Sequence, residues 1–315
     1  MPPVPAVLVT GASGLLGAHA CLAAAARGMR VVGTVHLHPV SLPGVELVGV
    51  DLSAEAEVRA LVDDVRPAWV LHCAAMTEVD RAQEHPHEAE LANVEATALL
   101  ARAAAAAGAG LVYVSTDAVY PGDRGGYAED DPTGPVNVYA RSKLAGEEAV
   151  RAAGPRHLVV RANLFGWNVQ PKQSLAEWIL AGLEAGGPVP GFADVCFNPL
   201  EAGELAGTLL DLAAGPHRGT VNAGASDRVS KYAFARMVAE VFGHDPGLVT
   251  PASAADAAFR APRPRDTSMD VSRLTAWLGR TPPTVRAGIE QFRRQRDDGF
   301  LDRLKGGPAH ATHNP

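Results

Sequence analysis

The sequence predicts an α/β fold: a Rossmann-type, doubly wound parallel sheet joined to a smaller C-terminal substrate-binding lobe. Three observations support this prediction. Between residues 6 and 164, short β-branched apolar runs alternate with longer Ala- and Leu-rich stretches, which is the pattern of βαβ units. A glycine-rich turn follows the first run. After residue 165 the alternation breaks into loops rich in Gly, Pro and Asn, which are typical of inserted substrate-contacting segments.

The strand and helix assignments follow the chain in order. Six apolar runs are predicted as strands, and they begin at Ala6, Arg30, Val45, Ala68, Gly110 and His157. The helices between them are expected near residues 15–27, 54–65, 84–107 and 138–153. A further helix is expected over residues 174–183. A helix over 201–213, a strand from Gly219 and a helix over 231–242 are expected to return to the sheet, and two short helices are expected to end the chain.

These elements divide the chain into a domain and a lobe. Residues 1–165 are the predicted dinucleotide-binding Rossmann domain, to which segments of about 195–245 return. Residues 166–302 mainly form the predicted substrate-binding lobe. The end of the chain, 303–315, is polar and rich in Gly and Pro, so it is predicted to be a disordered tail.

Composition argues against several classes of protein. The chain has 315 residues, of which 47% are hydrophobic and 20% charged, as in globular enzymes. Its net charge is −7 without a long basic run, which disfavours a nucleic-acid partner. The sequence has no run of 18 uncharged apolar residues and no recognisable leader, so a cytoplasmic, non-membrane protein is expected. Three widely separated cysteines favour free thiols, and no metal ligands are assigned.

The turn after the first predicted strand contains Gly11, Gly14 and Gly17 and runs directly into a helical stretch. Glycines at this spacing let backbone N–H groups approach a pyrophosphate at the positive end of the helix. A tight turn alone could also use them. Their place at the first βα junction favours cofactor binding, with the neighbouring contacts expected from Ser13, Leu15 and Leu16.

The end of the second predicted strand bears on which dinucleotide fits. An acidic residue there would accept a bond from a ribose 2′-hydroxyl, whereas a cationic group suits a 2′-phosphate. No acid precedes Glu46, and His36 stands near the strand end, so NADPH is favoured over NADH, although the imidazole could equally point into solvent. Asp51 and Leu52 end the third strand beside the expected adenine site, and Asp51 could instead cap the next helix.

Tyr139 and Lys143 lie four residues apart at the start of a predicted helix, so they share one face. An adjacent ammonium is expected to stabilise the phenolate and to lower the pKa of the tyrosine toward neutral pH, which would make the pair an acid/base unit. Such pairs are also common on solvated helices. Thr116 strengthens the catalytic interpretation, because it ends the fifth strand at the sheet edge where ligands of open α/β folds bind.

The order of glycine turn, strand-end hydroxyl and Tyr-x-x-x-Lys is similar to that of short-chain dehydrogenases/reductases. Residues 74–82, 115–120 and 135–147 resemble one family of the extended short-chain dehydrogenases/reductases, the dTDP-4-dehydrorhamnose reductases. Arg161 and the segments 198–200 and 263–265 resemble later parts of the same family. The likeness therefore covers nearly the whole chain.

This resemblance implies an NAD(P)H-dependent reductase that delivers hydride to C4 of a nucleotide-linked 4-keto-6-deoxy sugar. Tyr139 would protonate the new alkoxide, Lys143 would hold the ribose and tune the tyrosine, and Thr116 would orient the carbonyl. Further cofactor contacts are implied for Ala74, Ala75 and Asn93, and substrate contacts for Thr77, Val79, Asp117 and Arg263. Plainer roles stay open, such as a helix hydrogen bond for Asn93 and a surface position for Arg263. A homodimer is a further expectation from the resemblance.

The chain departs from the family pattern at Met76, 165–167 and 198–200, which leaves the sugar open more than the chemistry. Two alternative functions stay open. A nucleotide-sugar epimerase or dehydratase of the same superfamily would use the same Tyr/Lys pair, although Ala118 stands where dehydratases carry an acid. A non-catalytic, NADP-binding regulatory subunit similar to the methionine adenosyltransferase beta subunit could retain the same residues.

Overall fold

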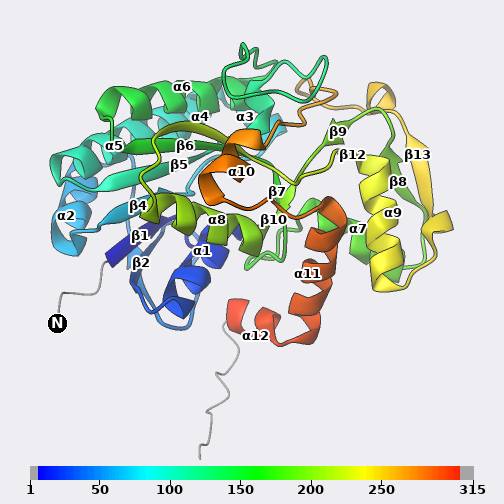
Figure 1. The fold of residues 1–315 in the computed structure, drawn as a ribbon, viewed down its shortest axis with the longest axis horizontal. Helices are drawn as coiled ribbons and strands as arrows, with labels where there is room; N and C mark the ends of the chain where they lie inside the picture. Colours follow the sequence, from blue (N-terminus) through cyan, green and yellow to red (C-terminus); the bar gives the residue numbers. More distant parts are fainter. Residues whose placement is uncertain (1–5, 306–315) are drawn as a thin grey trace, which may run out of the picture.

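The computed structural model describes residues 6–305, and its centre is a seven-stranded sheet (Figure 1). All neighbouring strands of this sheet pair in parallel, which confirms the predicted Rossmann-type fold. The strand order is β11-β6-β5-β4-β1-β2-β3. The strands are β1 (Ala6–Thr10), β2 (Arg30–Val35), β3 (Val45–Gly49), β4 (Trp69–His72), β5 (Gly110–Thr116), β6 (His157–Ala162) and β11 (Gly219–Ala223).

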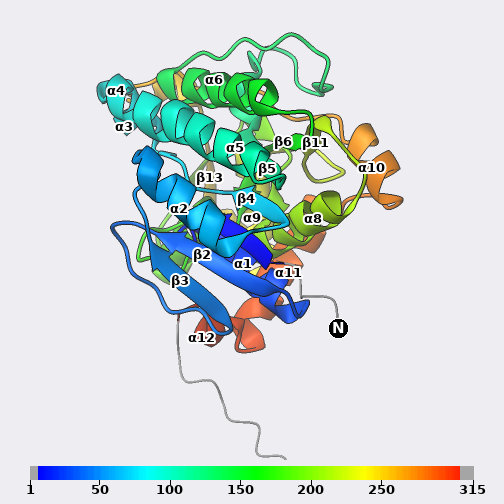
Figure 2. The ribbon, with the colours of Figure 1, turned by 90° about the vertical axis from the view of Figure 1, so that its left-hand side faces the viewer.

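Helices cover both faces of the sheet (Figure 2). On one face, α1 (Leu15–Ala26) and α8 (Ala202–Ala214) pack together and share their apolar core with the C-terminal lobe. On the other face lie α2 (Glu55–Val65), α5 (Ala96–Ala106) and α6 (Val138–Ala153), over a second core. Because both faces are covered, central strands are apolar on both sides, and β1 is buried along its whole length.

The stretch predicted as one helix over residues 84–107 is interrupted, so that prediction was wrong. It contains the end of α3 (Val79–Glu84), then α4 (Pro86–Glu90), the π-helical turn η1 (Leu91–Glu95) and α5. Pro86 explains the first break, because proline lacks an N–H and restricts the residue before it. The π-helical turn carries Asn93, and such turns are frequent at functional sites.

The C-terminal lobe consists of helices and short strand pairs. α7 (Leu175–Glu184) and α9 (Lys231–Phe242) pack with the parallel pair β8 (Val189–Phe192) and β13 (Val249–Ala252). α8 and β11 return to the sheet as predicted. α9 does not, because its buried face, which includes Phe234 and Val238, packs inside the lobe. The remaining pairs are β7 (Leu164–Phe165) with β10 (Leu200–Glu201), and β9 (Cys196–Phe197) with β12 (Val229–Ser230).

Three helices end the described chain, where two short ones were expected: α10 (Ser272–Leu278), α11 (Val285–Asp297) and α12 (Phe300–Leu304). Leu304 is fully buried and Lys305 caps the end of α12, so residues 303–305 do not belong to a tail. The rest of the predicted tail, 306–315, lies outside the described residues. Short 3-10 turns are η2 (Asp117–Val119), η3 (Pro246–Leu248) and η4 (Ala254–Asp256). Within residues 6–305, no helix combines the length and apolarity that crossing a bilayer requires.

Candidate active site

The glycine turn between β1 and α1 presents bare backbone. A Cβ on Gly11 would lie 2.8 Å from the backbone of Ala74, and one on Gly17 would lie 2.0 Å from the carbonyl oxygen of Gly11. Gly11 also has a φ of +71°, where other residues are strained. Among the described residues, no side chain caps the N-terminus of α1. The turn therefore fits a pyrophosphate held by N–H groups at the positive helix end.

The side chains around this turn differ in exposure. Ser13 and Leu15 are partly buried beside it, whereas Leu16 packs into the core, so only its backbone faces the turn. The position of Gly11 is fixed from β2, because the Gly11 N–H donates to the Thr34 hydroxyl at 3.3 Å. The loop after β4 completes the rim with Ala74 and its neighbour Ala75, both partly buried.

His36 and Asp51 stand at the carboxyl ends of β2 and β3. Asp51 Oδ1 accepts hydrogen bonds from the N–H and the hydroxyl of Ser53, at 2.9 and 2.7 Å. These bonds, with a smaller contribution from the nearby His36, hold the pKa of the Asp51 carboxyl below its usual value. Asp51 therefore organises the turn before α2, with Leu52 partly buried beside it, and the His36 side chain is exposed.

Asn93 is fully buried and holds the loop after β4 in place. Its Oδ1 accepts the Met76 N–H at 2.8 Å, and its Nδ2 donates to the Met76 carbonyl at 3.1 Å and to the Ser142 hydroxyl at 2.9 Å. Both amide hydrogens are thus used. The structure therefore places Asn93 between the loop that borders the glycine turn and the helix α6, where it positions both.

The three predicted catalytic side chains lie together. Asn137 caps α6, since its Oδ1 accepts the Ala140 N–H at 2.9 Å. In the first two turns of this helix, Tyr139 is partly buried next to the Thr116 hydroxyl at the end of β5. Lys143 is buried, with Nζ 4.1 Å from the centre of the Tyr113 ring.

Burial dominates the protonation of the Tyr139 and Lys143 pair. It raises the pKa of Tyr139 to about 12, although the Thr116 hydroxyl opposes this shift. It lowers the pKa of Lys143 to about 7, and the Glu147 charge partly offsets that lowering. The expected lowering of the Tyr139 pKa was therefore wrong, because desolvation of the phenolate dominates, the Asp117 charge adds to it, and the hydrogen bond with Thr116 opposes it only in part. Tyr139 keeps its proton at neutral pH, which suits a proton donor.

Asp117 links the site to the lobe. The resemblance placed it among the substrate contacts, but its side chain is buried, and its oxygens accept bonds from three side chains. Oδ1 accepts from the Thr116 hydroxyl at 3.1 Å, and Oδ2 accepts from Asn163 Nδ2 at 2.9 Å and from the Thr267 hydroxyl at 2.5 Å. Asn163 and Thr267 were not predicted as site residues from the sequence. They lie 46 and 150 residues away in the chain, and no local pattern pairs them with Asp117.

The lobe contributes a basic cluster, Lys231 and Arg263, that lies near Asp80 and Asp117. Arg263 forms an ion pair with Asp80 at 3.0 Å, and Asp80 also accepts the Ala261 N–H at 3.0 Å. Lys231, at the start of α9, lies near Asp117 and Arg263, and burial lowers its pKa. Lys231 was missed, because its place in the sequence shows only a helix start. In the loop after β4, Thr77 is exposed and Val79, which begins α3, is partly buried.

A cavity of about 430 Å³ opens beside this cluster. Three arginines line it, Arg260, Arg263 and Arg265, together with one carboxylate, Asp194, and the exposed ring of Phe259. The Arg263 guanidinium lies 4.8 Å from the centre of that ring. Guanidinium groups suit phosphate oxygens, and an exposed aromatic ring suits a base, so the cavity has the chemistry of a nucleotide site.

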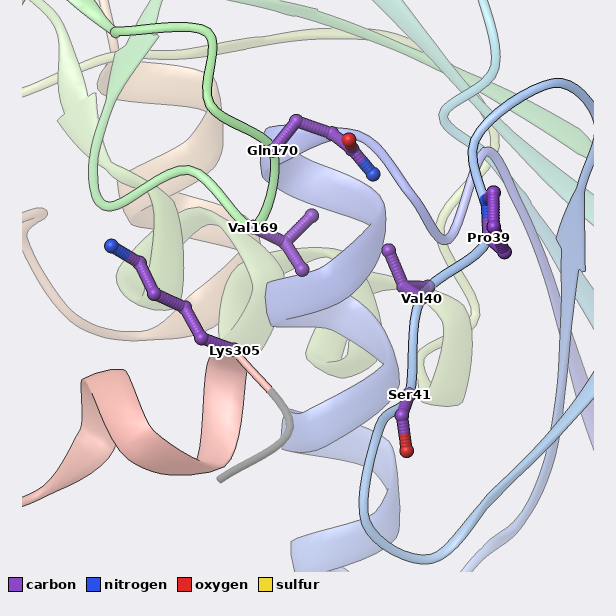
Figure 3. A pocket seen from close by; sticks show the side chains of 6 residues that line it. All are labelled: Pro39, Val40, Ser41, Val169, Gln170 and Lys305. Atoms are coloured by element: carbon purple, nitrogen blue, oxygen red, sulfur yellow. The ribbon is translucent and has the colours of Figure 1, made fainter.

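A second cavity of about 320 Å³ lies along α1, between residues 39–41 and residues 169–170 (Figure 3). Its lining is mostly apolar or uncharged, and Lys305 at the end of α12 is its charged side chain. It does not contain the catalytic side chains.

Helix α6, the catalytic helix that carries Tyr139 and Lys143, also carries Glu147. The Glu147 side chain is fully buried and joins α6 to β5 and β6. Its carboxylate accepts from the Ser115 hydroxyl at 2.6 Å and from two nitrogens of Arg161 at 2.9 and 2.8 Å. Burial alone would raise the pKa of Glu147, but the bonds from Arg161 keep it below its usual value. The carboxylate therefore stays charged one helical turn from Lys143.

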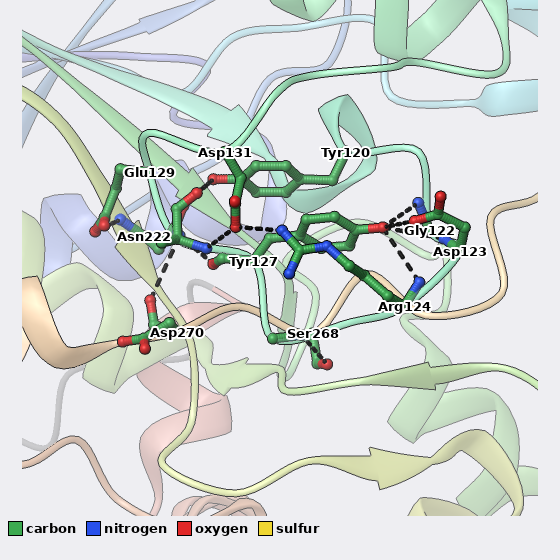
Figure 4. A network of polar contacts seen from close by, with 12 residues as sticks. Tyr120, Gly122, Asp123, Arg124, Tyr127, Glu129, Asp131, Asn222, Ser268 and Asp270 are labelled. Atoms are coloured by element: carbon green, nitrogen blue, oxygen red, sulfur yellow. Dashed lines mark hydrogen bonds and ion pairs between the residues drawn. The ribbon is translucent and has the colours of Figure 1, made fainter.

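The loop after β5 is tied to this ion pair through Tyr120, and Figure 4 shows its polar contacts with the lobe. Arg161 donates to the Tyr120 hydroxyl at 2.9 Å, and the Tyr120 ring stacks on Tyr127 with 4.6 Å between centroids. The Tyr127 hydroxyl accepts N–H groups from residues 122–124, and its backbone N–H donates to the Ser268 carbonyl. This network holds the loop against the lobe segment that carries Thr267.

Comparison with known proteins assigns the family. The model of the RmlD substrate binding domain matches residues 5–297. The chain belongs to this RmlD family. Its relatives include the probable low-salt glycan biosynthesis reductase Agl14 of Haloferax volcanii, 33% identical over 282 residues, which are 88% of this chain and 93% of that protein. The dTDP-4-dehydrorhamnose reductase of Mycobacterium tuberculosis is 38% identical over 285 residues, 88% of each chain.

A solved structure of the RmlD family has the same architecture. The dTDP-4-dehydrorhamnose reductase of Bacillus anthracis, in complex with NADP, superposes with a TM-score of 0.82 at 25% identity. The match covers 93% of this chain and all of that one. The resemblance stated from the sequence motifs is therefore confirmed.

Proposed function

We propose that this RmlD-family chain is an NADPH-dependent reductase of a nucleotide-linked 4-keto-6-deoxy sugar. The observation that carries the proposal is the placement of Tyr139 next to the Thr116 hydroxyl and one helical turn before Lys143, at the strand ends that also carry the glycine turn. Support for the substrate class comes from the M. tuberculosis relative, named as a dTDP-4-dehydrorhamnose reductase. Support for the cofactor comes from the B. anthracis structure, which holds NADP.

The residues divide the chemistry of ketone reduction among them. A nicotinamide dinucleotide, when bound at the glycine turn, supplies the hydride. In the substrate complex the Thr116 hydroxyl orients the carbonyl by turning its hydrogen from Asp117 to the carbonyl oxygen. The Tyr139 hydroxyl donates its proton to the same oxygen as the carbon gains the hydride. The C=O double bond thereby becomes C–H and O–H. The Lys143 ammonium stabilises the Tyr139 phenolate that is left, until solvent returns a proton.

The pH dependence follows from the two pKa values. Tyr139, with a pKa of about 12, stays protonated throughout the neutral range. Lys143, with a pKa of about 7, loses its ammonium charge as the pH rises through that value. We therefore expect kcat for reduction to fall as pH rises from 6 to 9, with its midpoint at about 7. Steady-state rates at saturating substrates test this, and a kcat that rises over the same range would contradict it.

The basic cluster predicts how the substrate is held. Replacing Arg263 by Met removes a charge-assisted bond of about 1.5–3 kcal/mol, so KM for the nucleotide sugar should rise about tenfold or more with little change in kcat. The matched control is Asp80→Asn, which breaks the ion pair of Arg263 but keeps the guanidinium. Equal KM values for the Arg263 variant and the wild type would remove Arg263 from the substrate site.

Cofactor preference is expected to depend on the end of β2. No carboxylate stands there, and the exposed His36 suits a 2′-phosphate. The variant His36→Asp adds an acceptor for a ribose 2′-hydroxyl and repels a 2′-phosphate. Its ratio of kcat/KM for NADPH over NADH should fall about tenfold, as for the loss of one charged contact. His38→Asp, two residues further on, is the control that adds the same charge outside the strand end.

The proposal as a whole is tested by mixing the protein with dTDP-4-dehydrorhamnose and following the absorbance of NADPH and of NADH in separate reactions. Oxidation that is faster with NADPH supports the proposed function. Saturable NADPH binding without oxidation would count against this sugar. The described thiols of Cys21, Cys73 and Cys196 are all free, which supports our further proposal of a reducing, cytoplasmic setting.

A further inference from the structure

A buried chain of hydrogen bonds runs through His72, which the mechanism above does not use. His72 ends β4 and is almost completely buried. Its Nδ1 lies 2.7 Å from the hydroxyl of Thr10, the last residue of β1, and its Nε2 lies 3.0 Å from the hydroxyl of Thr97 on α5. The Thr97 hydroxyl donates to the Asn93 carbonyl at 2.8 Å. Three elements thus meet at one imidazole.

The direction of each bond follows from the number of hydrogens. Thr97 uses its single hydroxyl hydrogen on the Asn93 carbonyl, so it must accept from an Nε2–H of His72. Burial lowers the pKa of His72 to about 3, with a smaller contribution from Lys143, so the ring is neutral and Nδ1 has no hydrogen. Nδ1 therefore accepts from Thr10, whose oxygen accepts the Ala74 N–H at 3.2 Å. The side-chain polar atoms of Thr10, His72 and Thr97 thus all have hydrogen-bond partners.

At one end the chain reaches the cofactor turn. Thr10 directly precedes Gly11, and Ala74 is the residue that a Cβ on Gly11 would strike. The hydrogen bonds that Thr10 makes with the Ala74 N–H and with His72 therefore fix the distance between β1 and the loop after β4. This distance sets how closely the loop approaches the glycine turn.

At the other end the chain reaches the catalytic helix. The Asn93 side chain donates to the Ser142 hydroxyl at 2.9 Å, and Ser142 donates to the carbonyl of Tyr139 at 2.8 Å. Helix α6 also lies close to the backbone of Asn93, because a Cβ on Gly146 would lie 2.6 Å from the Asn93 carbonyl oxygen. The position of the π-helical turn thus sets the position of the helix that carries Tyr139 and Lys143.

We propose that His72 is a positioning residue whose two ring nitrogens join the cofactor turn to the catalytic helix, one through Thr10 and the other through Thr97. A neutral imidazole suits this place, because it offers one acceptor and one donor on opposite sides. The two sides have separate effects. The Nδ1 bond sets cofactor affinity, and the Nε2 bond sets the alignment of Tyr139 and therefore kcat.

Two conservative variants separate the sides. An asparagine amide reaches the position of Nδ1 and a glutamine amide that of Nε2, whereas phenylalanine replaces neither. We expect His72→Phe and His72→Gln to weaken NADPH binding about fivefold, as for one lost hydrogen bond, and His72→Asn to keep it. We expect His72→Phe and His72→Asn to lower kcat about tenfold or more, and His72→Gln to restore most of it. Cofactor affinity is read from NADPH fluorescence.

His157→Phe is the matched control for lost stability. His157 is also a buried histidine on a strand of the same sheet, but it begins β6, whereas His72 ends β4. Among the described residues, its side chain bonds only the Ala101 carbonyl. It should lower the melting temperature without changing NADPH affinity or kcat. If the three His72 variants share one affinity, or if His157→Phe changes affinity and kcat as His72→Phe does, the proposal is wrong.

The kcat side of the inference rests on the proposed reduction of a keto sugar, whereas the affinity side rests only on the proposed binding of NADPH. If the wild type binds NADPH and fails to reduce the keto sugar, the substrate assignment falls, and the order of the NADPH affinities still decides the role of His72.

Discussion

Tyr139→Phe is expected to lower kcat by about 10²–10⁴-fold, because it removes the proton donor and leaves the ring in place. The hydroxyl lies next to Thr116, and burial keeps its proton in place at neutral pH. The dissociation constant for NADPH should change little, since the glycine turn and Lys143 are untouched. Rates with the keto sugar and a fluorescence titration with NADPH measure the two quantities on the same protein sample.

The control for this variant is Tyr232→Phe, which removes a hydroxyl from a partly buried tyrosine on α9. It should retain the activity of the wild type. A Tyr139→Phe protein that binds NADPH and still turns over near the wild-type rate would show that another group protonates the product.

Arg161→Met should be the most destabilising of the substitutions considered. The Arg161 and Glu147 side chains are 4% and 0% exposed, and the variant leaves the carboxylate buried without its two-bond partner. Removing one member of such a pair costs about 3–5 kcal/mol of the free energy of unfolding. The loss should appear in urea or thermal unfolding, together with lower activity, because Glu147 lies on the catalytic helix.

Arg151→Met is the matched control, since Arg151 pairs with the same carboxylate from an exposed position. Exposed ion pairs contribute about 0–1 kcal/mol, so the free energy of unfolding of this variant should stay close to that of the wild type. The double variant Glu147→Met with Arg161→Met removes both charges and should recover part of the lost stability. Equal losses for Arg151→Met and Arg161→Met would contradict the assignment of the buried pair.

Much of the fold could be predicted because its signals are local. The β-branched runs gave every strand of the main sheet, and helix α6 spans the predicted residues 138–153. The spacing of Tyr139 and Lys143 placed them on one helix face, and the end of β5 placed Thr116 beside them. Each of these predictions rests on a pattern of residues that are close together in the sequence.

The features that could not be predicted depend on distant residues or on burial. Asp117 resembled a substrate contact, but Asn163 and Thr267 come from other parts of the chain to hold it. The Lys143 ammonium was expected to lower the pKa of Tyr139 toward neutral pH. Burial raises that pKa instead, and no local sequence pattern indicates how deeply a side chain is buried. The break near Pro86 had a visible signal in the proline, but the Ala-rich stretch after it obscured that signal.

The central claim is that this site transfers hydride to a keto sugar and that Tyr139 completes the alcohol. The most direct test is to incubate the protein with dTDP-4-dehydrorhamnose and NADPH carrying two deuterium atoms at C4 of the nicotinamide, and to weigh the sugar product by mass spectrometry. We expect a dTDP-6-deoxyhexose that carries one deuterium, formed by the wild type and nearly absent with Tyr139→Phe. Unchanged keto sugar in the presence of bound NADPH would contradict it.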